Sequence, residues 1–208
     1  MDAISIIHHF YPEDNDFRKL LLLHSKQVKD KALQILSNCD LQLDRTIVEN
    51  GALLHDIGIG RCHAPSILCN GTEPYLAHGI IGAAMLRELD TSLEPYARIC
   101  ERHTGTGITA AEIVAQSLPS PIRDYLPETP EEKLICLADK FFSKSGDRRE
   151  KSLADIRQAD KLFLWRFGKI VFYGYWKILR GDFSGGDSRA RMTFANSRIR
   201  FKGGVQFT

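Results

Sequence analysis

The sequence predicts an all-α protein, and three observations lead to this fold class. Apolar side chains recur at helical spacing from Phe17 to about Leu179, without a long run of alternating apolar and polar residues. Helix start signals precede several of these periodic segments, and glycines or prolines follow them. A chain of 208 residues, 43% of them hydrophobic, can bury a sizeable core. We therefore expect one helical domain over residues 1–181.

The first two predicted helices each bear a histidine. Residues 16–37 form a helix whose apolar stripe has His24 in its middle. The second helix starts at Thr46, where Glu49 three residues later completes a capping-box pattern. It closes at His55, just before a glycine-containing segment. Both histidines are thus expected on regular structure.

The next two predicted helices follow a loop. Residues 61–74 contain prolines and a glycine and are predicted to form this loop. A helix over residues 75–89 then carries His78 in its first turn, and a helix over residues 93–102 ends directly before His103. Two more histidines are therefore expected at helix ends.

The helix with the strongest start signal begins at Thr129. Thr129 provides a capping hydroxyl, Pro130 stands in the first turn, and Glu132 occupies the third position. Asp139 lies one turn beyond the middle of this helix. Residues 152–179 are rich in aromatic side chains, and we expect one or two further helices there that close the core.

Charge and composition exclude several classes of protein. Lys and Arg number 28 and Asp and Glu 26, so the net charge is +2, and we expect no nucleic-acid partner. No apolar run is long enough to cross a bilayer, and the first residues lack the pattern of a secretory signal. We therefore expect a cytoplasmic protein without a membrane partner.

Residues 182–208 differ from the rest of the chain. This tail is basic, contains several glycines and has few large apolar groups, so we expect it to be disordered. We interpret it as a solvated extension rather than as an arm that binds polyanions.

The cysteines are predicted to be free, buried thiols. Their number is odd and they form no C-x-x-C pair, which argues against a disulfide framework and against a thiolate zinc site. They are Cys39, Cys62, Cys69, Cys100 and Cys136.

Histidines and aspartates gather in the apolar segments. A buried imidazole or carboxylate without a partner is costly, whereas one divalent cation compensates several of them at once. Each residue alone would more often be a hydrogen-bonded core residue, but the set indicates a metal site. The six residues are His24, His55, Asp56, His78, His103 and Asp139.

The order of these residues resembles a known family. His24, the tetrapeptide HDIG at residues 55–58 and a late Asp139, each on its own helix, are similar to the HD superfamily of metal-dependent phosphohydrolases. The resemblance covers residues 11–179, and it implies an HD-domain helical bundle with one metal ion held by four side chains. The implied ligands are His24, His55, Asp56 and Asp139.

The resemblance also implies a second ion. Members with two further histidines between the His-Asp pair and the last Asp hold two metals bridged by the central Asp, and His78 and His103 stand in the matching places. Nitrogen and oxygen ligands without thiolate suit iron, manganese, zinc, cobalt or magnesium. We therefore expect two divalent ions, with Asp56 touching both.

Hydrolysis of a phosphate ester or anhydride is the implied reaction. The substrate would be a small phosphorylated molecule, and we expect a nucleotide. Metal-bound hydroxide would attack phosphorus, so Asp56 counts as catalytic. Arg61 and Lys140 are catalytic candidates because their positive charge could hold a phosphate, and Lys144 is a further candidate.

Two other functions and the oligomeric state stay open. Relatives with this fold include di-iron oxygenases, and a nucleotide sensor without turnover is the third possibility. The other histidines are expected to be solvent-exposed, although His63 could also act as a general acid. They are His8, His9 and His63.

Overall fold

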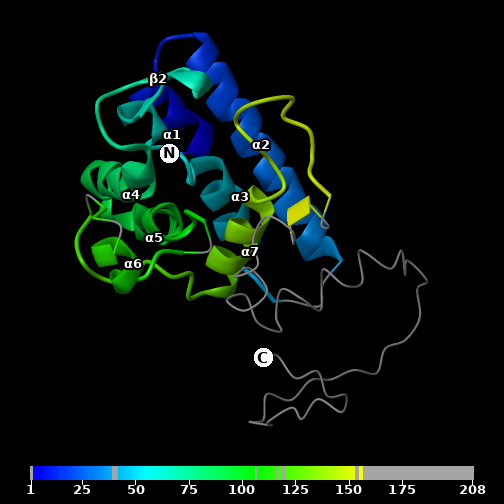
Figure 1. The fold of residues 1–208 in the computed structure, drawn as a ribbon. Coiled ribbons are helices and arrows are strands. Elements are labelled where there is room, and N and C mark those ends of the chain that lie inside the picture. The colour runs from blue at the N-terminus through cyan, green and yellow to red at the C-terminus, as the bar shows by residue number, and fades with distance from the viewer. Residues whose placement is uncertain are drawn as a thin grey trace, which may run out of the picture.

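A computed structural model describes most of the first 156 residues (Figure 1). Its described part is helical with one two-stranded sheet, which confirms the predicted all-α class. No helix in this part has the length and apolarity that crossing a membrane requires. The tail 182–208 and most of the predicted aromatic helices over 152–179 lie outside the described residues. The described ranges are 2–38, 42–105, 107–115, 117–118, 120–152 and 155–156.

The chain order of the elements is as follows. The α-helices are α1 (Ala3–Phe10), α2 (Asp16–Ser37), α3 (Arg45–Leu54), α4 (His78–Leu89), α5 (Glu94–Arg102), α6 (Ala110–Ala115) and α7 (Pro130–Asp139). The 3-10 helices are η1 (Ile59–Arg61), η2 (Pro65–Ile67), η3 (Tyr75–Ala77) and η4 (Thr91–Leu93). Strands β1 (His63–Ala64) and β2 (Cys69–Asn70) pair antiparallel.

The predicted second helix starts two residues earlier than expected. Asp44, not Thr46, caps α3, because its carboxylate accepts hydrogen bonds from the backbone amides of Thr46 and Ile47. Glu49 takes no part in a capping box and instead pairs with Arg45 at 2.7 Å. The helix itself is confirmed, and so is α2 with the predicted bounds.

Histidines lie at helix ends where the sequence predicted them. His78 is the first residue of α4, and His103 directly follows α5 as its C-cap. The capping box of Thr129 and Glu132 at the start of α7 is present in both directions. The capping box therefore placed the start of α7 correctly, whereas α4 and α5 begin three residues and one residue later than predicted, at His78 and Glu94.

Four short elements, two helices and two strands, were not predicted. Helix α1 begins at Asp2, whose carboxylate accepts from the amide of Ser5, and it buries Ile6 and Ile7. Helix α6 has six residues, and β1 and β2 have two residues each within the expected loop. Elements of this length contain too few residues for a hydrophobic period to be visible.

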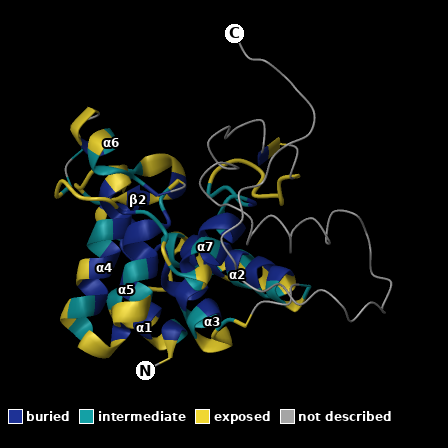
Figure 2. Ribbon diagram, turned by 90° about the horizontal axis from the view of Figure 1, so that it is seen from below, coloured by how far each residue is buried: buried dark blue, intermediate teal, exposed yellow. Residues whose placement is uncertain are grey.

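Helix α3 lies at the centre of the core. Val48 and Ala52 pack among buried side chains of α2, α5 and α7. Leu53 and Leu54 pack on the other side, among buried side chains of α1, α2, α4 and α5. Figure 2 shows the buried residues on the inward faces of the helices. The segment that follows α3 is therefore carried into the interior.

The described cysteines are buried thiols, as predicted, and none of them forms a disulfide. Cys100 Sγ donates to the carbonyl oxygen of Leu54 at 3.2 Å, and Cys136 Sγ donates to that of His103 at 3.3 Å. These thiols join the end of α3 to α5 and the end of α5 to α7. Cys39 lies outside the described residues.

Gly58 permits a close approach between the end of α3 and helix α4. A Cβ atom at Gly58 would overlap the carbonyl oxygen of His78 and the amide nitrogen of Gly82. On the other side, Tyr11 Oη donates to the carbonyl oxygen of Ile57 at 2.5 Å and fixes the same turn. The glycine therefore lets His78 come close to the residues that end α3.

A buried acidic side chain anchors α5. Glu101, only 5% exposed, accepts from Arg87 Nη1 at 2.9 Å and from Arg123 Nη2 at 3.0 Å. Arg87 also binds Glu94 with two hydrogen bonds of 2.7 and 2.9 Å. This network ties α4, α5 and the segment before α7 together two residues ahead of His103.

Gly58→Ala should destabilise the protein by about 1–3 kcal/mol, because the added methyl group has no room against backbone atoms. Urea unfolding measures this effect. Gly82→Ala is the matched control, since its Cβ would lie 3.0 Å from Gly58 N and 3.1 Å from Ile57 Cγ2. Its crowding is opposed by a gain in helix propensity of about 1 kcal/mol. Equal effects of the two substitutions would contradict the close-approach argument.

Glu101→Gln should lower the free energy of unfolding by about 1–3 kcal/mol, because two arginines lose a buried anionic partner. Glu94→Gln is its control on the same Arg87. The side chain of Glu94 is 48% exposed, so its replacement should cost less than about 1 kcal/mol. Thermal or urea unfolding of the two variants distinguishes a buried anchor from a surface pair.

Candidate metal centre

The six predicted ligands come together at one place, although 115 positions separate the first from the last. His24 lies in the middle of α2, and the other five lie at the ends of α3, α4, α5 and α7. Five are buried and Asp139 is half-buried. Their side chains form two groups that share Asp56: His24, His55, Asp56 and Asp139 in the first cluster, and Asp56, His78 and His103 in the second cluster.

The first cluster joins α2, the end of α3 and the end of α7. His24 Nε2 lies 2.9 Å from Asp139 Oδ1 and 3.3 Å from Asp56 Oδ2. His55 Nε2 lies 3.2 Å from Asp56 Oδ2 and 3.5 Å from Asp139 Oδ1. Two imidazole nitrogens and two carboxylate oxygens therefore face one point.

The second cluster uses the other oxygen of the shared carboxylate. Asp56 Oδ1 lies 3.4 Å from His78 Nε2 and 3.4 Å from His103 Nε2. The two imidazole nitrogens lie 3.1 Å apart. Asp56 thus stands between the clusters and offers one oxygen to each.

Backbone carbonyls orient three of the imidazoles. Each ring contacts, through Nδ1, the carbonyl oxygen three residues before it. Because a carbonyl only accepts, Nδ1 donates, and the Nε2 atom of a neutral ring keeps its lone pair for the cluster. The contacts are His55 to Ala52 at 2.7 Å, His78 to Tyr75 at 2.6 Å and His103 to Cys100 at 2.7 Å.

Electrostatics favour positive charge at this place. Burial opposes protonation of His55, but the carboxylates of Asp56 and Asp139 outweigh it and raise its pKa to about 10. Burial also opposes ionisation of both carboxyl groups, yet the nearby ammonium of Lys144 and the imidazoles hold their pKa well below the usual range. Burial and the neighbouring imidazole of His103 lower the pKa of His78 to about 4, which keeps it neutral at pH 7.

The donor set fits divalent cations. Within the described residues, His55 Nε2 and both oxygens of Asp56 are buried without a hydrogen bond of good geometry. The Nε2 atoms of His78 and His103 lie 3.1 Å apart and both face Asp56 Oδ1, so one cation could be bound by all three atoms. In each cluster the ligand atoms lie within 4.8 Å of one another, and ligands of one ion are spaced up to about 4.2 Å apart. Small side-chain shifts would bring them into coordination.

Lys144 reaches the first cluster from beyond the end of α7. Its Nζ lies 2.8 Å from Asp56 Oδ2. Lys144 was the third of the basic residues predicted to bind phosphate, and it contacts a carboxylate of the site. Arg61 is exposed at the end of η1, and Lys140 is half-buried directly after α7. The phosphate-binding roles of these two residues stay predictions. His63 is exposed on β1.

His8 and His9 are exposed on α1, as predicted.

Tyr75 is a site residue that sequence reasoning missed. Tyr75 is exposed, but its ring stacks on His78 with centroids 4.9 Å apart. It precedes His78 by three residues within η3, which is one turn of that helix. Its position one turn before His78 was the sequence signal that could have identified it.

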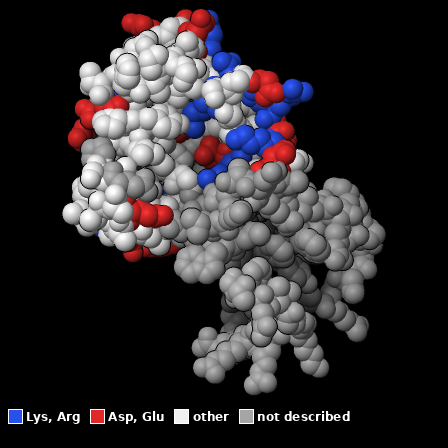
Figure 3. Space-filling view, viewed as in Figure 1, with Lys and Arg blue, Asp and Glu red and all other residues white. Residues whose placement is uncertain are grey.

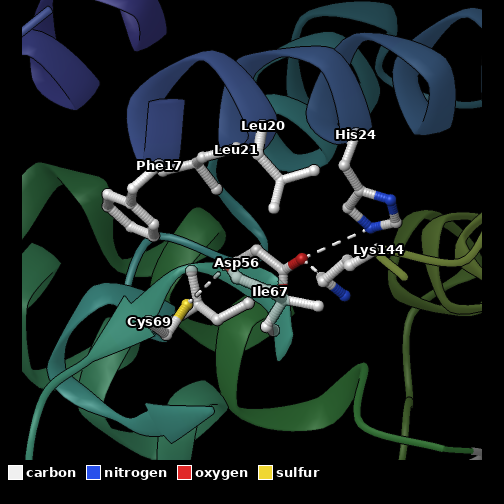
Figure 4. A pocket seen from close by; sticks show the side chains of 9 residues that line it. Phe17, Leu20, Leu21, His24, Asp56, Ile67, Cys69 and Lys144 are labelled. Atoms are coloured by element: carbon white, nitrogen blue, oxygen red, sulfur yellow. Dashed lines mark hydrogen bonds and ion pairs between the residues drawn. The ribbon is translucent and has the colours of Figure 1, made fainter. Parts of the chain in front are cut away.

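A small pocket adjoins the first cluster (Figure 4). Most of its wall is apolar, and one end is polar. Figure 4 shows the side chain of Lys144 beside Asp56 at that end, with the apolar residues of α2 along one side. The lining residues are Phe17, Leu20, Leu21, His24, Asp56, Ile59, Ile67, Cys69 and Lys144.

Three relatives resemble this chain over much of its length. A tRNA (cytidine(56)-2'-O)-methyltransferase of Picrophilus torridus is 37% identical over 136 residues, which cover 65% of this chain and 35% of that protein. A protein of the same name from Thermoplasma volcanium is 35% identical over 133 residues, 63% of this chain and 33% of that protein. An uncharacterized protein of Methanocaldococcus jannaschii is 34% identical over 170 residues, 80% and 85% of the two chains.

This chain spans about a third of each methyltransferase and most of the Methanocaldococcus protein. No solved structure shows a significant match. The family model of the HD domain matches residues 21–143, a range that contains all six residues of the two clusters. Because this match covers more than half of the sequence, the chain belongs to the HD domain family.

Proposed function

We propose that this protein is a metal-dependent phosphohydrolase that cleaves a phosphate ester or anhydride of a small molecule, a nucleotide. The observation that carries the proposal is the position of Asp56, whose two oxygens face separate clusters of imidazoles. Paired divalent ions that share a carboxylate are typical of sites that hydrolyse phosphates. Membership of the HD domain family supports metal-dependent hydrolysis in general.

Each cluster would hold one ion. His24, His55 and Asp139 would bind the first together with Asp56 Oδ2, and His78 and His103 would bind the second together with Asp56 Oδ1. When bound, divalent ions at these ligands would lower the pKa of coordinated water to near 7 and neutralise charge on the phosphoryl oxygens. Iron, manganese, zinc, cobalt and magnesium are the candidates.

The protein's own side chains would position the substrate. The ammonium of Lys144 borders the pocket beside the first cluster and can pair with a phosphoryl oxygen. Most of the pocket wall is apolar, and such surroundings strengthen charge interactions. Arg61, at the end of η1, and Lys140, directly after α7, are proposed as further phosphate contacts.

An RNA substrate is the second candidate, because two relatives are named as enzymes that act on tRNA. The surface charge favours the small molecule. On the face shown in Figure 3, lysines and arginines gather over one side of the described part, but aspartates and glutamates lie among them. A duplex or a folded RNA is usually bound by a more continuous basic surface.

Phosphate release in the presence of metal tests the proposal. The purified protein should contain a divalent metal and should release phosphate from at least one member of a panel of nucleoside mono-, di- and cyclic phosphates and dinucleoside polyphosphates. The panel also includes RNA oligonucleotides with terminal phosphates, which test the second candidate. A chelator should abolish the activity, and added metal should restore it.

Other results would support the alternative functions. Oxygen consumption by an iron-containing protein without phosphate release would indicate a di-iron oxygenase. Tight nucleotide binding by the metal-loaded protein without phosphate release would indicate a sensor. Either result would contradict the proposed hydrolase.

Asp56→Ala should lower kcat/KM about a thousandfold or more even at saturating metal, because both clusters lose their shared carboxylate. Circular dichroism should show that the helices persist. Asp30→Ala on the exposed side of α2 serves as the control and should keep its activity. Full turnover by the Asp56 variant would refute the assignment.

His103→Ala should reduce the number of tightly bound ions from two to one, because the second cluster then has one imidazole left. His24→Ala should remove the other ion. Elemental analysis after dialysis measures both ratios without any substrate. An unchanged metal content in the His103 variant would contradict a separate second ion.

A further inference from the structure

Lys144 brings a positive charge into the first cluster. Its Nζ lies 2.8 Å from Asp56 Oδ2 and 3.9 Å from Asp139 Oδ1, and its side chain is 13% exposed. Asp56 Oδ2 is also the oxygen that faces His24 and His55, at 3.3 and 3.2 Å. The ammonium therefore lies against the atom that the first cluster would offer to a metal ion.

An ammonium and a divalent ion would repel each other strongly around one carboxylate oxygen. Charges a few ångströms apart in a partly buried place interact through a much lower effective dielectric than in water. Metal binding at the first cluster therefore requires Lys144 Nζ to withdraw from Asp56 Oδ2. The free energy lost when this ion pair separates reduces the affinity for the metal ion.

The surroundings of Lys144 allow such a withdrawal. It lies five residues beyond Asp139, outside α7, and residues 145–150 after it are exposed. Its side chain borders the pocket beside the first cluster, as Figure 4 shows. The side chain can therefore turn away from Asp56 without disrupting a packed helix.

We infer that Lys144 competes with the metal ion of the first cluster for Asp56 Oδ2 and so lowers the metal affinity of this cluster. The second cluster is affected less, because it uses Asp56 Oδ1, which faces His78 and His103 at 3.4 Å. The inference rests on the metal binding proposed above. It also implies that an anion which attracts Lys144 will tighten metal binding, since such a coupling between two ligands is reciprocal.

Titration calorimetry with Mn²⁺ on chelator-treated protein tests the inference. In a His103→Ala background, which isolates the first cluster, Lys144→Met should lower the Kd for Mn²⁺ about tenfold or more. Lys144→Arg keeps the charge and should keep the weaker binding. Lys26→Met removes a charge from an exposed site on α2, so it should change the Kd by less than about twofold.

Inorganic phosphate provides the second comparison. Phosphate can contact the bound ion directly, and this contribution is the same with and without the lysine. It should therefore tighten Mn²⁺ binding more in the protein with Lys144 than in the Lys144→Met variant. An equal effect in both proteins would overturn the coupling to anions.

Thermal unfolding in the presence of a chelator separates competition from simple packing. Lys144→Met should melt at a lower temperature than the parent there, because Asp56 and Asp139 lose a countercharge, although it binds Mn²⁺ more tightly. A lysine that only supported the fold would weaken both properties. Lys144→Gln is the second variant should the methionine variant fail to fold.

The outcomes distinguish this inference from the proposed function. An unchanged or higher Kd in both uncharged variants, with Mn²⁺ binding intact in the parent, overturns the role of Lys144 alone. A parent protein that binds no divalent ion at all overturns the inference and the proposed hydrolase together.

Discussion

The carboxylate of Asp56 is the group on which the arrangement of the molecule depends. It is buried at 0% exposure, and within the described residues neither of its oxygens receives a hydrogen bond of good geometry. An ionised group in such surroundings is stable only beside positive charge. The ends of four helices and the middle of a fifth supply the groups around it. The packing of the helical bundle therefore determines the geometry of the site.

Gly58 and Tyr11 help to bring the imidazoles and the buried carboxylate of Asp56 together. Gly58 lets α4 approach until His78 faces one oxygen of the carboxylate, and Tyr11 holds the backbone of Ile57 from the other side. Further along the chain, Glu101 is fixed by two arginines and holds α5 in the place where His103 can face the same oxygen. Residues outside the two clusters therefore determine where the cluster side chains lie.

Most of the fold and all six cluster residues could be predicted from the sequence, because both leave strong local signals. Helix periodicity and the Thr129 capping box place the long elements, and histidines in apolar segments mark the residues of the two clusters. The cap at Asp44 was assigned wrongly because Thr46 and Glu49 offered an equally good local pattern. The contact between Lys144 and Asp56 depends on the path of the chain after α7. This path is set by tertiary packing and leaves no periodic pattern in the sequence.

The likeness to two tRNA methyltransferases concerns about a third of their length. A name given to a whole enzyme does not identify the chemistry of each part, since one fold supports many functions. The HD domain match, at residues 21–143, contains the six cluster residues. The methyltransferase name therefore describes the longer proteins and is not carried over to this chain.

Three imidazoles are oriented by backbone carbonyl oxygens, so substitutions of the neighbouring side chains have little effect on the orientation of these rings. In many metal sites a side-chain carboxylate fixes the ring, and a single substitution there disturbs the ligand. Here the partners of His55, His78 and His103 are carbonyl groups of Ala52, Tyr75 and Cys100, which any residue at those positions would provide. Homologues can consequently diverge around the histidines while the rings keep their protonation pattern, as long as the helix ends stay in place.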